Sequence, residues 1–209
     1  MGGKRALEQH LSKAERFAHP RIDLEQYATP ADIAAHIIHF ADVHGDIQDR
    51  IVVDLGSGPG IFAIGMAFRQ PQRVVGIELD RAAITVAQAN ERAISPPQPI
   101  DWIRADATRA PLNQNDAMTV LMNPPFGAQQ SNLHADRAFL QTAARIADVS
   151  YSLHNAGSRS FIDAFVTENE GHVDAAMQVS FDLTHQFDFH EEAETIVEAE
   201  LYRVEWGTA

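Results

Sequence analysis

The sequence contains no cysteine, and lysine occurs only at positions 4 and 13. The lack of cysteine excludes disulfide bonds and thiolate metal sites. Long apolar runs are also missing, so no segment has the length of a membrane-spanning helix. The first 17 residues are charged and polar and lack the apolar stretch of a signal peptide. We therefore expect a cytoplasmic protein that does not bind to a membrane.

Basic residues are scarce relative to acidic ones, and the formal net charge is −13. A nucleic-acid-binding protein usually presents a basic face, so this negative charge argues against binding to nucleic acid through electrostatic attraction. An acidic surface with few lysines is a possible adaptation to high intracellular salt. Salt at that level would screen phosphate contacts and leave recognition to shape and stacking. With 209 residues, of which 45% are hydrophobic, the chain has the size of one domain, residues 1–209.

Short apolar runs alternate with amphipathic helical patterns as far as residue 170. The runs predict strands over residues 51–55, 73–77, 100–104, 118–122 and 149–154. The amphipathic patterns predict helices over residues 3–18, 30–44, 61–68, 81–93, 135–147 and 158–170. Residues 173–182 then alternate strictly between apolar and polar, and a last strand is expected over about 195–206. The predicted fold class is α/β, with a Rossmann-like sheet of seven strands that is mostly parallel and ends in an antiparallel hairpin.

The turn Asn123-Pro124-Pro125-Phe126 follows the fourth predicted strand. Two prolines cannot donate to a sheet ladder, so the strand must end there in a stiff turn. Ligands bind at this edge of open α/β sheets. Asn123 and the Pro124 carbonyl would offer two acceptors to one NH2 group, and Phe126 would offer a face for a planar ring. Taken alone, the turn fits this site no better than an ordinary proline loop.

A glycine-rich turn after the first strand reads Asp54-x-Gly56-x-Gly58-Pro59-Gly60 and leads into a helix at Ile61. A strand, a glycine turn and a helix are typical of nucleotide binding. The second strand ends at Glu78, where an acidic residue typically binds a ribose diol. Asp80 is expected to cap the next helix.

Other candidates carry weaker signals. Thr29 is expected to cap the second helix, and Gln26 lies just before it. Asp106 follows the third strand. Two interpretations explain it equally well: it forms a turn, or it contacts an adenine. His154 is most simply a structural histidine, and Arg159 is a candidate phosphate contact in a position where a solvated arginine is more common.

The first turn and Glu78 would suit NAD as well as S-adenosylmethionine. The glycines do not follow the dinucleotide spacing G-x-G-x-x-G, and the sheet ends in a reversed hairpin. The Asn-Pro-Pro-Phe turn also lies where a methyl acceptor would be placed. These three features favour S-adenosylmethionine.

The pattern as a whole resembles class I methyltransferases of the N6-adenine type. It is most similar to the methyltransferase-like protein 5 family, whose members methylate adenine in small-subunit ribosomal RNA. The matching segments are Leu24-Glu25-Gln26-Tyr27-x-Thr29, Asp54-Leu55-Gly56-x-Gly58-x-Gly60, Asn123-Pro124-Pro125-Phe126-Gly127, Asp136-x-Ala138-Phe139-Leu140, Tyr151-Ser152-Leu153-His154 and Phe187-x-Phe189-His190. They follow the family's order along nearly the whole chain.

This resemblance implies roles for residues and partners. Residues 1–45 would complete the cofactor site, where Gln26 and Thr29 would close over S-adenosylmethionine. The segment from Gly56 to Ile61 would line the amino-acid end of the cofactor, Glu78 its ribose and Asp106 its adenine. The resemblance further implies an RNA substrate and a small zinc-binding activator protein that covers a sheet edge. The family's lysines around the Phe-His pair are replaced here by acidic residues, as in Asp188-Phe189-His190-Glu191-Glu192.

Two other functions fit parts of the pattern. A protein glutamine N5-methyltransferase would use the same turn for a planar side-chain amide, but that family usually has tyrosine where this chain has Phe126. A ribosome-assembly or RNA-binding factor without catalysis would need cations that this chain lacks.

Overall fold

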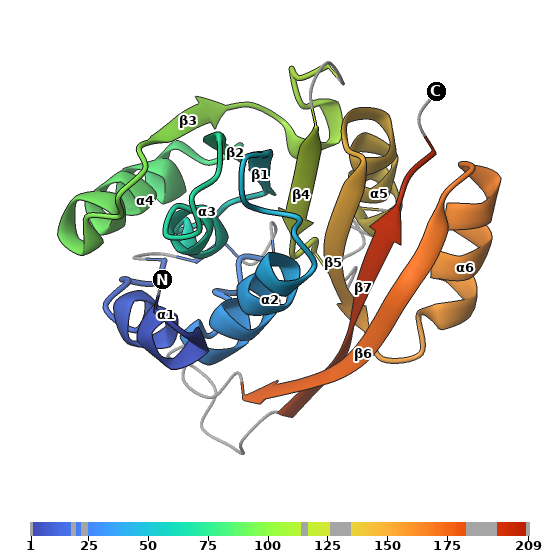
Figure 1. The fold of residues 1–209 in the computed structure, drawn as a ribbon, viewed down its shortest axis with the longest axis horizontal. Helices are drawn as coiled ribbons and strands as arrows, with labels where there is room; N and C mark the ends of the chain where they lie inside the picture. The colour runs from blue at the N-terminus through green and yellow to red at the C-terminus, as the bar shows by residue number, and fades with distance from the viewer. Residues whose placement is uncertain are drawn as a thin grey trace.

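A seven-stranded sheet runs through the centre of the protein in the computed structural model (Figure 1). The structure describes residues 2–17, 20–21, 25–113, 117–125, 135–182 and 196–207. The strands are β1 (Ile51–Leu55), β2 (Arg73–Glu78), β3 (Ile100–Arg104), β4 (Met118–Met122), β5 (Val149–Asn155), β6 (His172–Asp182) and β7 (Ile196–Glu205). Their order across the sheet is β3-β2-β1-β4-β5-β7-β6.

The first five strands are parallel, and β7 runs antiparallel to both of its neighbours. The predicted fold class is therefore confirmed, including the reversed C-terminal hairpin. The central strands β1 and β4 are buried almost throughout, as expected for a parallel sheet that is covered on both faces. The register pairs Asp54 of β1 with Leu121 of β4, so both strands end at the same edge.

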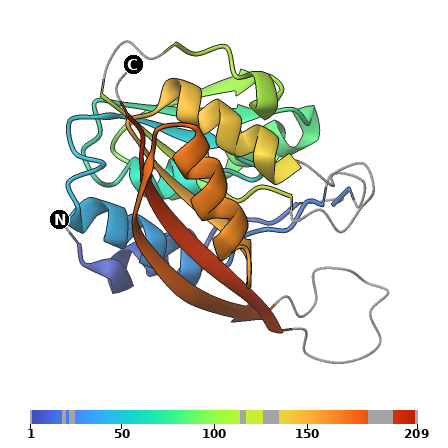
Figure 2. The same cartoon turned by 90° about the vertical axis from the view of Figure 1, so that its right-hand side faces the viewer.

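Helices cover both faces of the sheet (Figure 2). Helices α1 (Lys4–Leu11), α2 (Ala31–Val43) and α3 (Ile61–Met66), together with the end of α4 (Arg81–Ile94), share one apolar core. Helices α5 (Ala135–Ile146) and α6 (Arg159–Glu168) form the other core, with the short 3₁₀ helix η2 (Ala107–Arg109). None of the helices in the described ranges has both the length and the apolar character that are needed to cross a bilayer.

Besides α6, which spans Arg159–Glu168 rather than residues 158–170, two predicted helices are shorter than expected. The first was expected over residues 3–18, but α1 ends at Leu11, and residues 14–17 follow in an irregular conformation. Leu7 and Leu11 are buried as the apolar stripe predicts, whereas Ala14 and Phe17 belong to a segment that crosses the glycine turn. Helix α3 likewise ends at Met66 rather than at residue 68. Periodicity overestimated both helices because half-buried apolar residues, Ala14, Phe17 and Phe68, continue the apolar pattern beyond the helix ends.

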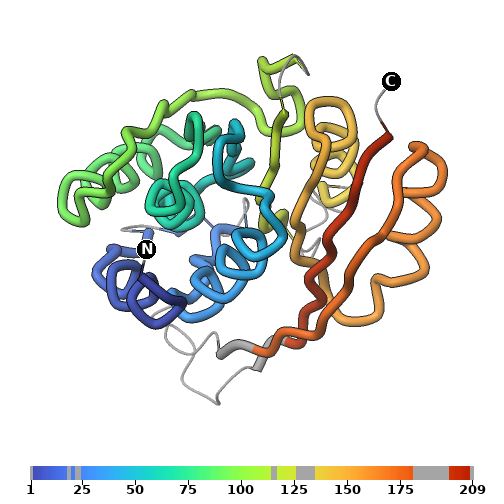
Figure 3. Tube along the Cα trace, in the orientation of Figure 1, coloured from blue at the N-terminus to red at the C-terminus, as the bar shows by residue number. Residues whose placement is uncertain are grey.

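The C-terminal hairpin projects beyond the edge of the sheet at which the parallel strands end (Figure 3). Strand β7 pairs with β5 only from Ala199 to Glu205, with Ala199 opposite Asn155, but it pairs with β6 from Ile196 onward. The far ends of β6 and β7 therefore have no neighbour in β5. The segment between them, with the motif Phe187-x-Phe189-His190, lies outside the described residues.

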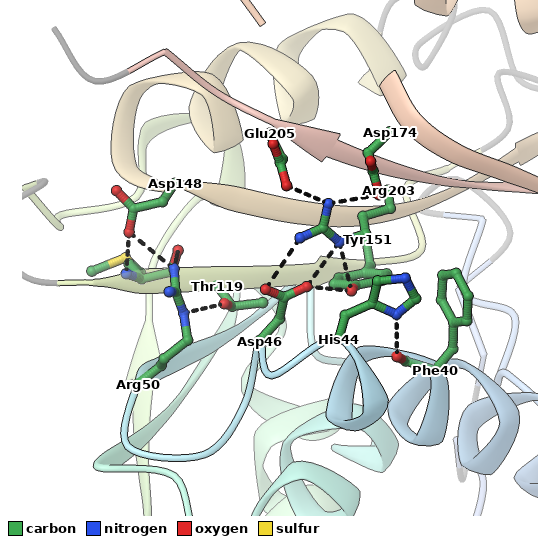
Figure 4. Close-up of polar contacts among 11 residues, drawn as sticks. Phe40, His44, Asp46, Arg50, Thr119, Asp148, Tyr151, Asp174, Arg203 and Glu205 are labelled. Atoms are coloured by element: carbon green, nitrogen blue, oxygen red, sulfur yellow. Dashed lines mark hydrogen bonds and ion pairs between the residues drawn. The ribbon is translucent and has the colours of Figure 1, made fainter. Parts of the chain in front are cut away.

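A buried polar network connects the end of α2 to this hairpin (Figure 4). Arg203 of β7 donates from Nε to Asp46 Oδ2 at 2.9 Å, and from Nη1 to Asp174 at 2.9 Å and Glu205 at 2.6 Å. The Tyr151 hydroxyl donates to the same Asp46 oxygen at 2.5 Å. Asp46, Tyr151 and Arg203 are all buried. Because each buried charge has a partner, the network supports the packing of α2 against the C-terminal strands.

Candidate active site

A cavity of about 240 Å³ opens at the carboxyl ends of β1 and β4. Four parts of the chain form its walls: the end of α1 with the segment after it, the residues before α2, the glycine turn, and the turn after β4. The lining residues are 11, 12, 14–17, 27–31, 54, 56–59, 61, 62 and 123. The cavity therefore lies at the edge where ligands bind in open α/β sheets.

The glycine turn brings its backbone close to the neighbouring side chains. Gly58 has φ +50°, and a Cβ atom there would lie 2.8 Å from Phe17 Cζ. Gly60 has φ +88°, and a Cβ atom would lie 2.5 Å from Trp102 Cη2. Only glycine fits at both positions, because the backbone conformation and the close approach of Phe17 and Trp102 exclude a side chain.

Asp54 lines the cavity and is buried. Its Oδ2 accepts a hydrogen bond from the Ala63 amide at 2.8 Å, which joins the end of β1 to α3. Burial raises the pKa of Asp54 to about 7, with a smaller contribution from the nearby Glu78 carboxylate, while the Ala63 bond opposes the shift. The carboxyl group is thus balanced between its neutral and ionised forms near neutral pH, and a cation in the cavity would favour the ionised form.

Asn123 also lines the cavity, directly after the end of β4. Its Nδ2 donates to the Thr29 hydroxyl at 3.0 Å. Its Oδ1 is buried and has no hydrogen-bond partner among the described residues. A buried acceptor without a partner costs free energy unless a ligand satisfies it. The amide is therefore held by its nitrogen while its oxygen remains available.

The contact with Asn123 changes the expected role of Thr29. Thr29 was predicted to cap the second helix, but α2 begins at Ala31 with Pro30 at the N-cap and no side-chain capping bond. The prediction was wrong because the Thr29 hydroxyl meets Asn123 instead. Thr29 lines the cavity all the same.

The prolines end β4 as predicted, since the strand stops at Met122 and Pro124 is buried. Phe126, predicted to stack on the acceptor ring, lies outside the described residues, as does the following segment 127–134. Its role stays a prediction.

Three predicted cofactor residues do not line the cavity. Glu78 is buried, and its carboxylate accepts from the amides of Gly58 and Asp80, each at 2.8 Å. Burial raises the pKa of Glu78, while these backbone bonds oppose the shift. Gln26 bridges the Arg21 amide and Asp80 Oδ2, at 2.9 and 3.1 Å.

The third of these residues is Asp106, which is exposed and accepts from the Thr108 amide at 2.9 Å, so it caps η2. The remaining predicted cofactor residues do line the cavity: Thr29, Asp54, Gly56, Gly58, Pro59, Ile61 and Asn123.

Two features of the cavity refine what the resemblance implies for residues 56–61 and 1–45. Ser57 lies between the glycines with a buried hydroxyl oxygen that has no partner among the described residues. The segment after α1 forms one wall, although it was predicted to be helical.

His154 and Arg159 lie near the end of β5 and outside the cavity lining. His154 is buried, and burial lowers its pKa to about 4, while its Nε2 has no partner among the described residues. Arg159 is exposed and forms an ion pair with Asp163 at 2.7 Å. The structural interpretation of His154 agrees with this placement.

Comparison with known proteins identifies the family. The model of the methyltransferase small domain matches residues 31–160, which hold the glycine turn and the Asn123 turn. The Mettl5 rRNA N6-adenosine methyltransferase of Drosophila melanogaster is 34% identical over 98% of this chain and 97% of its own length. The METTL5 enzyme of Danio rerio is 30% identical over 94% and 96% of the two chains. This chain belongs to the methyltransferase small domain family, among the METTL5 proteins.

A solved structure supports the same assignment for this methyltransferase. A candidate RNA methyltransferase from Pyrococcus horikoshii superposes with a TM-score of 0.87 at 32% identity, and each chain is covered completely. The similarity therefore extends beyond the family domain to the N-terminal helices and the C-terminal hairpin. Class I methyltransferases use S-adenosylmethionine, and the buried Asp54 carboxyl group and the unpaired Ser57 hydroxyl in the cavity lining fit the polarity of that cofactor.

Proposed function

We propose that this methyltransferase transfers a methyl group from S-adenosylmethionine to N6 of an adenine in RNA, and specifically in small-subunit ribosomal RNA. The observation that carries the proposal is the Asn123 amide, whose nitrogen is fixed by Thr29 and whose buried oxygen has no partner. An exocyclic amine is a donor that such an oxygen would accept. The relatives named as rRNA N6-adenosine methyltransferases supply the substrate class.

Some residues around the cavity would bind the cofactor, and others would bind the methyl acceptor. Gly56, Gly58, Pro59 and Ile61 would hold the amino-acid end of the cofactor, and ionised Asp54 would stabilise its positive charge. When bound, the cofactor supplies an electrophilic methyl group on a sulfonium. As in the related family, we assign binding of the cofactor's ribose to Glu78 and of its adenine to Asp106, and we assign to Gln26 the closing of the site over the cofactor. To bind the ribose, the Glu78 carboxylate would have to give up the hydrogen bond that it accepts from the Gly58 amide.

Acceptor binding would depend on the turn after β4. Asn123 Oδ1 and the Pro124 carbonyl would accept the two hydrogens of the adenine amine, and Phe126 would stack on the ring. Both acceptors orient the nitrogen lone pair toward the methyl group and favour the positive charge that develops on nitrogen. The adenine must be unpaired or flipped out of a helix to reach the turn. After transfer, the charged amine can lose its proton to water, so no strong base is required.

The direct test incubates the protein with labelled S-adenosylmethionine and, in separate reactions, small-subunit ribosomal RNA and a release factor. The proposal predicts label in the RNA, recovered as N6-methyladenosine after digestion. Label in the release factor would assign glutamine methylation instead. Binding of RNA without any transfer would contradict both enzyme functions.

A small zinc-binding activator protein completes the proposal, and the edge strand β3 is the surface that favours it. An unpaired edge is a template for another chain unless it is covered. Leu79, beside this edge, has 49% of its surface exposed, and its carbonyl accepts from Arg104 of β3 at 3.2 Å. We expect the activator to raise the melting temperature on co-expression and Leu79→Glu to weaken the complex. Val43→Glu, at the end of α2, places the same charge at another exposed aliphatic side chain and is the control.

A further inference from the structure

Residues 12–17, called the strap below, form one wall of the cavity. The strap lies outside the matched family domain, which begins at residue 31. All of its residues except Lys13 line the cavity. The Phe17 ring lies against the glycine turn, so closely that a Cβ atom at Gly58 would be 2.8 Å from Phe17 Cζ. The strap is therefore in contact with the backbone that would hold the cofactor.

A single buried side chain on α4 holds the strap in place. Asn90 Oδ1 accepts from the Glu15 amide at 2.8 Å, and Asn90 Nδ2 donates to the Glu15 carbonyl at 2.9 Å. The same nitrogen donates to the Pro59 carbonyl at 3.0 Å. Asn90 is only 2% exposed. Its amide therefore joins the strap to the glycine turn, and each of its polar atoms is satisfied by backbone groups of these two segments.

The cavity is small for its proposed ligand, and its walls differ in how they are held. Its volume of about 240 Å³ is below the roughly 300–1,000 Å³ of typical small-molecule sites. The sheet, α3 and the glycine turn are fixed by backbone ladders and helix bonds. The strap between Ala14 and Phe17 is irregular and is held through Asn90 and through the contact of Phe17. Asn90 thus supplies both described hydrogen bonds that hold Glu15 of the strap to α4, so its loss would free this wall.

The geometry points to Asn90 as a positioning residue that holds the strap closed over bound S-adenosylmethionine and thereby sets the rate at which the cofactor leaves. This inference rests on the proposed function, because it takes the cofactor to be the ligand of the cavity. Asn90 does not contact the methyl acceptor. Its loss should therefore change cofactor binding while leaving the rate of transfer at saturating cofactor unaltered.

The experiment measures dissociation of S-adenosylhomocysteine by stopped-flow tryptophan fluorescence, since Trp102 packs beneath the glycine turn. The variants are Asn90→Asp, which keeps the acceptor for the Glu15 amide but loses the donors, and Phe17→Ala, which leaves Asn90 intact. We expect each to release the product about tenfold faster. The KM for S-adenosylmethionine should rise similarly and kcat should stay within twofold of wild type.

Asn169→Ala is the matched control. The Asn169 amide donates to the Phe165 carbonyl at 2.8 Å at the end of α6, on the other face of the sheet. Its loss should lower the melting temperature without changing the dissociation rate.

Three results would overturn the inference in distinguishable ways. Wild-type protein that fails to bind S-adenosylhomocysteine would remove the proposed function and the inference together. Wild-type binding with unchanged dissociation from both variants would leave the proposed function standing and reject the role of the strap. A fall in kcat with an unchanged KM would show that Asn90 acts on transfer and not on cofactor retention.

Discussion

The network around Arg203 and the cavity beside Asn123 are both buried and polar, but they differ in how completely their atoms are paired. In the network, all three guanidinium nitrogens of Arg203 have carboxylate partners. In the cavity, Asn123 Oδ1 and Ser57 Oγ have no partner among the described residues. The first region lies where the C-terminal hairpin joins the sheet, and the second lies where the parallel strands end.

This difference in pairing indicates that the network serves stability and the cavity serves function. A buried polar group that is fully paired can hold elements together, whereas an unpaired one lowers stability until a ligand satisfies it. We therefore expect changes in the network to alter unfolding and changes in the cavity to alter catalysis. The following predictions test this separation, from the largest expected effect to the smallest.

Removing Arg203 should give the largest loss of stability. Arg203→Leu leaves Asp46 buried without its cation, and we expect the free energy of unfolding to fall by about 3–5 kcal/mol. Urea denaturation measures the change. Arg159→Leu, which removes an exposed and solvent-screened ion pair, is the control and should cost far less. Equal losses in the two variants would show that the network adds nothing beyond a surface pair.

His154 should make the fold sensitive to acid. Its pKa is about 4 in the folded protein and near 6.5 when unfolded, so the unfolded chain binds more protons between these values. The neutral buried form thus contributes stability that is present above pH 6.5 and is lost as the pH falls toward 4. Relative to His154→Leu, the wild type should lose about 3 kcal/mol over this range. Parallel pH profiles of unfolding for the two proteins would contradict the assignment.

Asp54 should make cofactor affinity depend on pH. With a pKa of about 7, Asp54 is mostly protonated at pH 6 and mostly ionised at pH 8. Binding of a cationic cofactor should therefore strengthen by about tenfold across this range, because only the ionised form attracts the positive charge. Calorimetry with S-adenosylmethionine measures the effect. Asp54→Asn should bind weakly and with little pH dependence, and a variant that keeps the wild-type profile would exclude Asp54 as its source.

Thr29 should have the smallest effect, because it acts through Asn123. Thr29→Val removes the partner of Asn123 Nδ2 and should lower kcat/KM by about fivefold, the value of one neutral hydrogen bond. Thr29→Ser keeps the hydroxyl and should retain most of the activity. If the serine variant is as impaired as the valine variant, keeping the hydroxyl does not preserve activity, and the proposed role of the hydrogen bond to Asn123 is contradicted.

The sheet could be predicted from the sequence because its strands are buried runs bounded by glycine, proline or acidic residues. Pro124 fixes the end of β4, and the alternation from Val173 to Val179 marks β6. Helix ends were harder to predict, since Ala14 and Phe17 continue an apolar stripe that α1 does not follow. The chain beyond that helix instead contacts the glycine turn through Phe17, and no local pattern encodes this contact.

The candidate site was predictable where a residue type is dictated by backbone geometry. Gly58 and Gly60 have positive φ angles that few other residues adopt, and both could be identified from spacing alone. The contact of Asn90 with Glu15 joins residues 75 positions apart, and the contact of Thr29 with Asn123 joins residues 94 apart. Side-chain bonds over such separations leave no periodic signal, so they became visible only in the folded structure.

The most direct test of the unpaired Asn123 oxygen compares Asn123→Ala with wild type in a single turnover of methyl transfer to small-subunit ribosomal RNA, with S-adenosylmethionine saturating. The account predicts a rate about 100- to 1,000-fold lower, an unchanged cofactor affinity and a melting temperature that does not fall. A transfer rate close to wild type, from a variant that still binds the cofactor, would contradict it.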